Sequence, residues 1–398
     1  MNQPKENPAA KPWRLLPLLM AMTAIGPATL NILVPALPAM ITKLGTDVAT
    51  VQLTISLYMV SLACAQFLLG PLSDRFGRRP VVLAGLTIAV IASIGAYAAT
   101  SIGALITARV VQAAGVSTGI VMGRAIIRDL YDRDRAAGMI GLVTTAMVIA
   151  PMLAPVVGGI LETTFGWESI FAFIMLLTIA VLAWAVMMLP ETHVRTTAVN
   201  FTAMLREWKS LLSNRTFYAY TLCGAFGCAP HFTMVGGGPH VIITLMGRSS
   251  AEYGMWFMIS SLGYMSGNFT VSRIAQRFGL DTLIIAGLVV ELIGAVITVV
   301  LFASYPDGGP AVVFLPQFII SYGNGLLLPN CIAGAVSVRP EAAGTASGVI
   351  GFIQMGTGAA SVQIVSMFLL GATTAMPIAW IMLAVVLMAG VSFGALRR

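Results

Sequence analysis

Long apolar runs alternate with short polar breaks along almost the whole chain. A run of about 20 apolar residues is long enough to cross a bilayer as an α-helix. Twelve runs are predicted to be membrane-spanning helices, over residues 15–38, 51–70, 80–99, 102–124, 138–161, 168–189, 217–236, 252–271, 282–303, 311–332, 344–367 and 376–395. The pattern therefore predicts an all-α polytopic membrane protein.

The composition supports this class and excludes a soluble one. Of the 398 residues, 58% are hydrophobic and 9% are charged, whereas soluble domains carry about 25% charged residues. The four cysteines lie inside apolar runs and lack the spacing of a zinc site. We therefore expect small buried cysteines, with no disulfide framework, no metal site and no cofactor.

One substantial hydrophilic connector, residues 190–216, lies at the midpoint of the chain. It separates an N-terminal half at 15–189 from a C-terminal half at 217–398, and residues 1–14 form a polar segment before the first helix. The first apolar run is too long for the core of a signal peptide. We therefore expect this run to be retained as a helix.

Short matches repeat between the two halves in the same order. RFG at 75–77 recurs at 277–279, and AG at 84–85 recurs at 286–287, both with an offset of 202. RAAG at 135–138 is followed by EAAG at 341–344. We expect two pseudo-symmetric halves of six helices each, with a substrate site near the membrane midplane where the halves meet.

The distribution of Lys and Arg predicts the orientation, because cytoplasmic loops carry an excess of both. With both termini and the 190–216 linker in the cytoplasm, eighteen of the 22 basic residues lie on the inner side. Only Lys43 and Arg248 lie outside, while Arg109 and Arg124 fall in the fourth span. This bias accounts for the net charge of +7 without a nucleic-acid partner.

The loop after the second span, GPLSDRFGRRP at 70–80, resembles the signature loop of the major facilitator superfamily. That pattern, G-x-x-x-D-R-x-G-R-[KR], is met by Gly70, Asp74, Arg75, Gly77, Arg78 and Arg79. The resemblance implies a conformational gate that can hold the two halves together on the inner side. A basic loop that only sets topology is the alternative, but it explains neither the aspartate nor the glycines.

The fourth span, ARVVQAAGVSTGIVMGR, resembles the fourth-helix motif of the superfamily, with Arg109 as its arginine. An arginine inside a span is costly unless it is paired or faces a cavity. The alternative is that Arg109 extends to the outer interface. Gly115 and Gly119, with Gly123 after them, predict a closely packed helix face.

The fifth span contains APMLAPVVGG, which resembles the antiporter motif G-P-x-x-G-G through Pro155, Gly158 and Gly159. The motif marks exporters in the superfamily. Together with LVPALP at 33–38, GRAIIRDLYDRDRAAG at 123–138 and GGGPHVII at 236–243, it resembles the bicyclomycin-resistance (Bcr/CflA) group of drug:proton antiporters. This resemblance implies a multi-pass protein of the bacterial cytoplasmic membrane.

At the expected proton site this sequence differs from the Bcr/CflA group. Its usual acid, a little before the L-P-x-L-P, is replaced by Asn31, and the carboxylate deepest in a span is Glu291. We expect Glu291 to be buried or protonated, because a carboxylate facing lipid is costly, and it either couples protons or is a neutral structural group. His231 is a further candidate for substrate or proton contact, beside a glycine stretch at 236–239 that is expected to unwind.

The inner end of the fourth span carries three aspartates among arginines, and we expect a salt-bridge cluster of Asp129, Asp132 and Asp134. The histidine after the glycine stretch, His240, is expected to pack at an interface.

The sequence thus favours efflux of a small amphiphilic drug or metabolite by proton antiport, with alternating access to a site between the halves. Uptake of a small polar metabolite, by symport or facilitated transport, is the alternative that Asn31 leaves open. No H-E-x-x-H or P-loop motif indicates an enzyme. The expected partners are substrate, protons and membrane lipid, and the expected state is a monomer.

Overall fold

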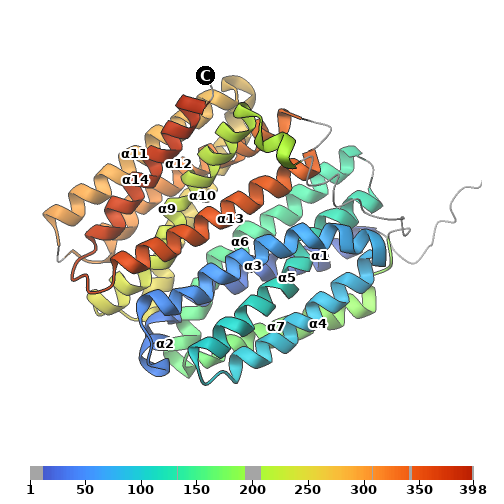
Figure 1. Ribbon diagram of the computed structural model, residues 1–398, viewed down its shortest axis with the longest axis horizontal. Coiled ribbons are helices and arrows are strands. Elements are labelled where there is room, and N and C mark those ends of the chain that lie inside the picture. Colours follow the sequence, from blue (N-terminus) through green and yellow to red (C-terminus); the bar gives the residue numbers. More distant parts are fainter. Residues whose placement is uncertain (1–11, 132, 193–207, 307, 340–342, 397–398) are drawn as a thin grey trace, which may run out of the picture.

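The computed structural model describes residues 12–131, 133–192, 208–306, 308–339 and 343–396. These residues form helices, with no strand among them (Figure 1). The α-helices are α1 (Leu16–Asn31), α2 (Leu37–Leu44), α3 (Val48–Phe76), α4 (Arg78–Tyr97), α5 (Ile102–Leu130), α6 (Arg133–Phe165), α7 (Glu168–Met188), α9 (Arg215–Pro239), α10 (Ser250–Phe278), α11 (Leu280–Ser304), α12 (Pro310–Ser337), α13 (Ala343–Phe368) and α14 (Met376–Leu396). Short 3₁₀ segments are η1 (Pro12–Leu15) and η2 (Val34–Ala36), and one π-helical segment is η3 (His240–Leu245).

The predicted spans all fall on these helices. Within the described residues, nine helical runs are long and apolar enough to cross a membrane. The other three, α6, α9 and α10, have 33, 25 and 29 residues and so also have the length of a span. The all-α membrane class is confirmed.

The first span is longer and more broken than predicted. It runs from Trp13 to Leu44 and changes from α1 to η2 to α2 around Pro35 and Pro38. A proline has no N–H to donate to the preceding turn and its ring crowds that turn, which interrupts the regular α-helix.

Polar caps and glycines mark where the helices begin and end. The Asp47 carboxylate accepts a hydrogen bond from the Thr50 N–H at 2.9 Å, which caps α3. Ser101 and Ser249 cap α5 and α10 in the same way. Between α3 and α4 the chain turns at Gly77, whose φ of +97° suits a residue without Cβ.

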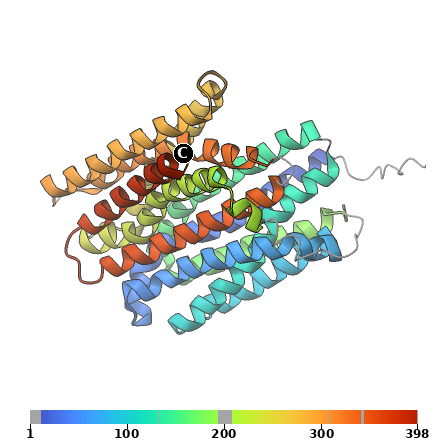
Figure 2. The same cartoon turned by 45° about the horizontal axis from the view of Figure 1, so that its top comes forward.

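The helices of the C-terminal half, α9–α14, repeat the packing of the membrane-spanning helices of the N-terminal half. In the N-terminal half α5 packs on α3 and α4, α1 packs on α6, and α4 packs on α7. In the C-terminal half α12 packs on α10 and α11, α9 packs on α13, and α11 packs on α14. The halves meet where α3 packs on α13 and α6 packs on α10, and both views separate the blue-to-green half from the yellow-to-red half (Figures 1 and 2).

The two ends of the bundle differ in how the halves touch. We name the end with residues 70–80 the basic end, and the end with residues 45–47 and 246–249 the opposite end. Near the opposite end, Gln52 donates to the Gly236 carbonyl and Gln363 donates to the Ala49 carbonyl. These contacts hold the halves together there.

At the basic end an aromatic side chain from the segment between the halves lies at their junction. The ring of Trp208 is 4.7 Å from that of Phe67 on α3 and 5.7 Å from that of Phe352 on α13. The two halves therefore meet through Trp208 at this point.

One prediction about α9 is wrong. The glycine stretch 236–239 is helical and fully buried rather than unwound. A Cβ on Gly236 would collide with Val362 and Val365 of α13. The glycines therefore serve close helix packing, and the irregular turn, η3, begins at His240.

Candidate functional site

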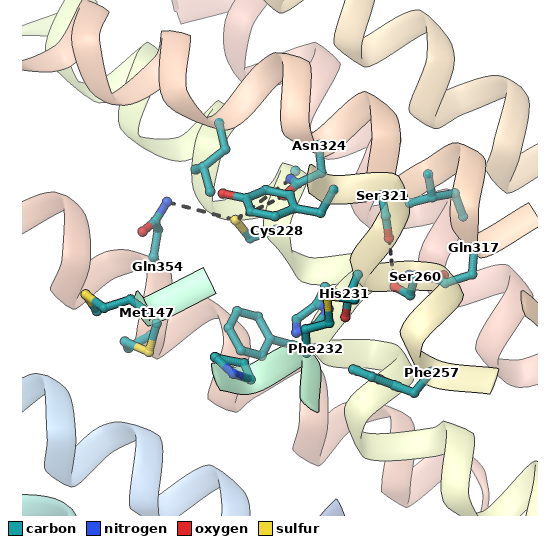
Figure 3. A pocket seen from close by; sticks show the side chains of 18 residues that line it. Met147, Cys228, His231, Phe232, Phe257, Ser260, Gln317, Ser321, Asn324 and Gln354 are labelled. Carbon is teal, nitrogen blue, oxygen red and sulfur yellow. Dashed lines mark hydrogen bonds between the residues drawn. The ribbon is translucent and has the colours of Figure 1, made fainter. Parts of the chain in front are cut away.

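A cavity of about 270 Å³ lies among α6, α9, α10, α12 and α13, and thus between the two halves (Figure 3). Its apolar wall includes Met147 and Met152 from α6, and Phe232, Phe257 and Met355 from the other half. Flexible thioethers and aromatic rings can adapt to apolar ligands of different shape. The cavity can therefore take a small amphiphile.

Apart from His231, the polar side chains that line this cavity are hydroxyls, amides and a thiol. Ser260 and Ser321 share a hydrogen bond of 2.8 Å across α10 and α12. The Nδ2 of Asn324 and the Nε2 of Gln354 donate to the Sγ of Cys228 at 3.8 and 3.9 Å. Such groups can orient a ligand by hydrogen bonding without requiring it to carry charge.

Gln317 is the polar side chain of the wall that the protein leaves unsatisfied. It is 1% exposed, and neither its Nε2 nor its Oε1 has a hydrogen-bond partner in the part of the chain that the structure describes. A buried amide without partners costs free energy. A ligand with both a donor and an acceptor can satisfy it.

His231 lies in the cavity wall. Its ring contacts the edges of Phe232 and Phe257, with centroid distances of 5.4 and 5.8 Å. It can therefore touch a ligand, as the sequence suggested for a substrate contact. Its part in proton transfer stays a prediction.

His240 does not line this cavity. It begins η3 and is partly buried, and its Nδ1 has no hydrogen-bond partner within the described residues.

Glu291 is fully buried on α11, directly behind the wall. Gly323 of α12 packs against it, so the carboxyl lies between the two helices. Neither carboxyl oxygen has a hydrogen bond of standard geometry to any described residue. Asn324, which lines the cavity, is its polar neighbour and is close enough to interact with it.

Asn31 lies apart from this site. Its Nδ2 donates to the Pro27 carbonyl at 3.0 Å, one turn earlier on α1, and it is not among the residues that line the cavity. The amide nitrogen is therefore used within its own helix, whereas the Oδ1 is buried without a hydrogen-bond partner among the described residues.

The loop at 70–80 forms a dense polar network. Arg78 donates to Asp74 at 2.6 Å and to Asp129 of α5 at 3.1 Å. The Glu191 carboxylate accepts from the backbone N–H groups of Arg78 and Arg79 at 2.9 and 3.3 Å. The described partners all lie at the basic end of the N-terminal half, and none of them belongs to the described part of the other half.

Arg75 and Gly70, which also belong to the signature, lie outside the hydrogen-bond network of Arg78. Arg75 lies over the ring of Phe76, 5.3 Å from its centroid, and Gly70 has open space where a Cβ would be. Their function in a gate stays a prediction.

The predicted aspartate cluster is only partly visible. Asp129 pairs with Arg78 and also accepts from the hydroxyl of Thr192 at 3.2 Å. Asp132 and the side chain of Asp134 lie outside the described part of the chain.

Arg109 is 0% exposed, so it does not extend to the outer interface. Its guanidinium lies 4.1 Å from the centroid of the Tyr58 ring and donates to Gln112 at 2.7 Å and to the Thr54 carbonyl at 3.4 Å. Gln112 in turn donates to Ser93 at 2.7 Å. Arg109 therefore joins α3, α4 and α5.

The glycines of the fourth and fifth spans mark close helix contacts. A Cβ on Gly115 would meet the Gly85 carbonyl of α4, and one on Gly119 would meet the Met22 carbonyl of α1. Gly158 packs against the Ile32 carbonyl in the same half. Gly159 packs against the Ser250 carbonyl of the other half.

The antiporter motif thus lies where the halves touch. The carbonyl of Pro155 lies where a Cβ on Gly254 of α10 would be. Pro151, one turn away, lines the cavity. The motif connects the cavity wall with the junction between α6 and α10.

A profile of the Major Facilitator Superfamily matches residues 19–362, well over half of the chain. The chain belongs to the major facilitator superfamily. The resemblance inferred from the loop at 70–80 is therefore confirmed, and the protein is a multi-pass membrane protein of a transporter superfamily.

Several bacterial relatives are similar over most of the chain. The transporter is 29% identical to multidrug resistance protein D of Escherichia coli (strain K12), over 344 residues that cover 85% of each chain. It is 30% identical to a chloramphenicol resistance protein of Pseudomonas aeruginosa, covering 82% of this chain and 75% of that protein. A bicyclomycin resistance protein homolog of Haemophilus influenzae is 24% identical, with coverage of 90% and 89%.

Solved structures agree with the fold. The crystal structure of a D-xylose–proton symporter superposes with a TM-score of 0.78 at 14% identity, covering 97% of this chain and 98% of that one. At this identity the likeness shows the major facilitator fold alone.

Several residues of the transporter's cavity were not singled out from its sequence. They are Cys228, Ser260, Gln317, Ser321, Asn324 and Gln354. A neutral polar residue in an apolar run gives no signal of whether it faces a cavity or a neighbouring helix. Only the helix packing separates the two.

Proposed function

We propose that this transporter exports small amphiphilic compounds across the bacterial cytoplasmic membrane by proton antiport. The observation that carries the proposal is the buried Glu291 carboxyl, without a hydrogen-bond partner among the described residues, one side chain behind the cavity wall. The names of its relatives, which refer to multidrug, chloramphenicol and bicyclomycin resistance, support the substrate class.

The way in which the halves touch supports alternating access. The hydrogen bonds of Gln52 and Gln363 close the opposite end. The basic end carries most of the Arg residues and is assigned to the cytoplasm by the positive-inside rule. Breaking the contacts at the opposite end and closing those at the basic end would present the same cavity to the other side.

The coupling chemistry uses Glu291 and Asn324. A buried carboxyl without a hydrogen bond of standard geometry favours the neutral acid, because its anion would be desolvated with little compensation. Asn324 lies between Glu291 and the cavity, so its movement can admit water to the carboxyl. The acid releases its proton to the cytoplasm before substrate binds, and takes up a proton from outside as substrate leaves.

The test measures proton flux in proteoliposomes with an inside-acid gradient and a pH-sensitive dye. Phenicols, bicyclomycin and cationic dyes are added to wild type, Glu291→Gln and the control Glu252→Gln. Glu252 forms only a 4.0 Å ion pair at the opposite end, and such a pair contributes little. We expect Glu291→Gln to lose at least about tenfold of the substrate-driven flux while the control retains it, because an amide cannot carry the proton.

Asn324→Leu is a second variant for this test. It removes the polar side chain that contacts Glu291 and lines the cavity, but it keeps the Glu291 carboxyl. We expect slower coupling with folding intact. If Glu291→Gln showed the same proton flux as wild type, Glu291 would not be the proton-coupling residue. His231 would then be the next residue to test. Binding of substrate to wild type without any proton flux would favour a transporter that is not proton-coupled.

A further inference from the structure

A second arginine of α5 lies beside the cavity. Arg124, six residues before the end of the helix at Leu130, has an exposed side chain. Its Nη2 is 3.9 Å from the Sδ of Met147 on α6. Met147 is part of the cavity wall, so the guanidinium lies next to the apolar part of the site.

The position of Arg124 on its helix directs it away from lipid. Val111, an exposed apolar residue, marks the outward face of α5. Because a helix turns once in 3.6 residues, Arg124 lies about 140° around α5 from Val111. α5 also packs on α1, α3, α4 and α6, which surround it within the half. Arg124 therefore lies on a different side of α5 from Val111, where it contacts Met147 of α6.

The charge of Arg124 is not compensated within the described residues. Asp129 and Asp74 form ion pairs with Arg78. Glu191 accepts hydrogen bonds from backbone N–H groups of the 70–80 loop. The charged neighbour of Arg124 is Arg128, one turn further along α5, which adds positive charge.

The carboxylate nearest the cavity does not offset this charge. Glu291 belongs to α11 in the other half and is not among the residues that line the cavity, whereas its neighbour Asn324 is. The cavity thus has a largely apolar wall, and a cation lies beside one residue of that wall, Met147.

We propose that Arg124 recognises an anionic group of the substrate, such as a carboxylate or sulfonate, while the apolar body of the substrate occupies the cavity. A guanidinium presents a planar pair of N–H donors that matches a carboxylate. The inference rests on the proposed function and narrows its substrates to anionic amphiphiles, with cationic amphiphiles disfavoured by Arg124 and Arg128.

The experiment compares two ligands with one body. Chloramphenicol is neutral, and its hemisuccinate ester adds a carboxylate. Binding of each is measured on the full-length protein in a neutral maltoside detergent, so that lipid phosphates are absent. The variants are Arg124→Gln, Arg124→Lys and the control Arg277→Gln, whose arginine lies on α10 over Phe278 at the basic end.

We expect wild type to bind the ester about tenfold more tightly than the neutral compound, since a charge-assisted hydrogen bond contributes at this scale. Arg124→Gln should abolish the difference and leave binding of the neutral compound within about twofold. Arg124→Lys should retain part of it because its charge remains, and Arg277→Gln should retain all of it.

Two results overturn the inference while the proposed function stands. One is equal binding of both compounds to wild type. The other is an unchanged preference in Arg124→Gln. Added phosphatidylglycerol that competes with the ester only through Arg124 would instead assign the arginine to a lipid headgroup. Binding of neither compound to wild type counts against the proposed function itself, and the inference falls with it.

Discussion

Two ionisable side chains, Arg109 and Glu291, are both fully buried inside their halves of the molecule, and their surroundings are opposite. Arg109 has Gln112, the Thr54 carbonyl and the face of Tyr58 around its guanidinium. Glu291 has no hydrogen-bond partner among the described residues, and it lies beside a residue of the cavity wall. Neither has a described ion of opposite charge in contact.

The difference shows that burial alone does not decide whether an ionisable side chain is structural or exchanges protons. A cation with two acceptors and an aromatic face is held in position, and it stabilises the packing of the helices that supply them. An acid without donors is not held by its surroundings, so its charge state can change when the cavity is hydrated. We therefore propose that Arg109 is a structural centre of the N-terminal half and that Glu291 is the group of the C-terminal half that exchanges its proton.

The largest effect is expected from Arg109→Met. It leaves Gln112 and the Thr54 carbonyl without their partner and removes the cation from Tyr58. Unsatisfied buried polar groups cost about 1–3 kcal/mol each, so we expect a loss of about 3 kcal/mol or more. A thermal melt in detergent and size-exclusion chromatography would show it, and an unchanged melting temperature would remove Arg109 from this role.

Glu291→Leu should change stability in the other direction. Replacing a buried acid that lacks partners by an apolar side chain of similar size removes a desolvation cost, so we expect about 1–2 kcal/mol of stabilisation. The same thermal melt measures it, with Glu291→Gln as the polar control that is expected to gain less. Strong destabilisation by both variants would mean that Glu291 holds the helices together, as the structural alternative states.

The smallest effect is expected from Tyr58→Phe. The hydroxyl of Tyr58 donates to the Gly26 carbonyl at 2.9 Å, whereas its ring carries the contact with Arg109. Hydrogen bonds between membrane helices contribute about 0.6 kcal/mol on average. The variant should therefore melt close to wild type, while Tyr58→Leu, which also removes the ring, should lose more. Equal losses in the two would show that the ring contributes nothing.

The spans and their order follow from the sequence, because the length of an apolar run and the caps at its ends are local properties. Asp47 and Ser249 begin helices where a polar side chain can accept from a free N–H. The break at Pro35 is equally local, although the twelve predicted ranges missed it. The prediction for Gly236 was wrong because a glycine in a span has two common roles: it can unwind the helix, or it can let another helix pack closely. Only the position of α13 in the structure shows that Gly236 has the second role.

The site is less accessible from sequence. Glu291 stands out because a carboxylate in an apolar run is costly wherever it lies. Arg109 and Arg124 occur in the same span, yet one is enclosed by its own half and the other reaches the cavity wall. Gln317 and Asn324 gain their significance from the opposing helices. Contacts between distant segments decide these roles, and no local pattern encodes them.

The crossing of α6 and α10 has a consequence for how such a molecule can evolve. Gly159 meets the backbone at Ser250, and Gly254 meets the backbone at Pro155, so each half supplies the glycine that the other half's backbone requires. A larger side chain on either helix pushes both halves apart, and no single change in the partner helix restores the fit. Two halves that arose from one ancestral unit can diverge elsewhere, but at this crossing they inherit a shared limit on size and must change together.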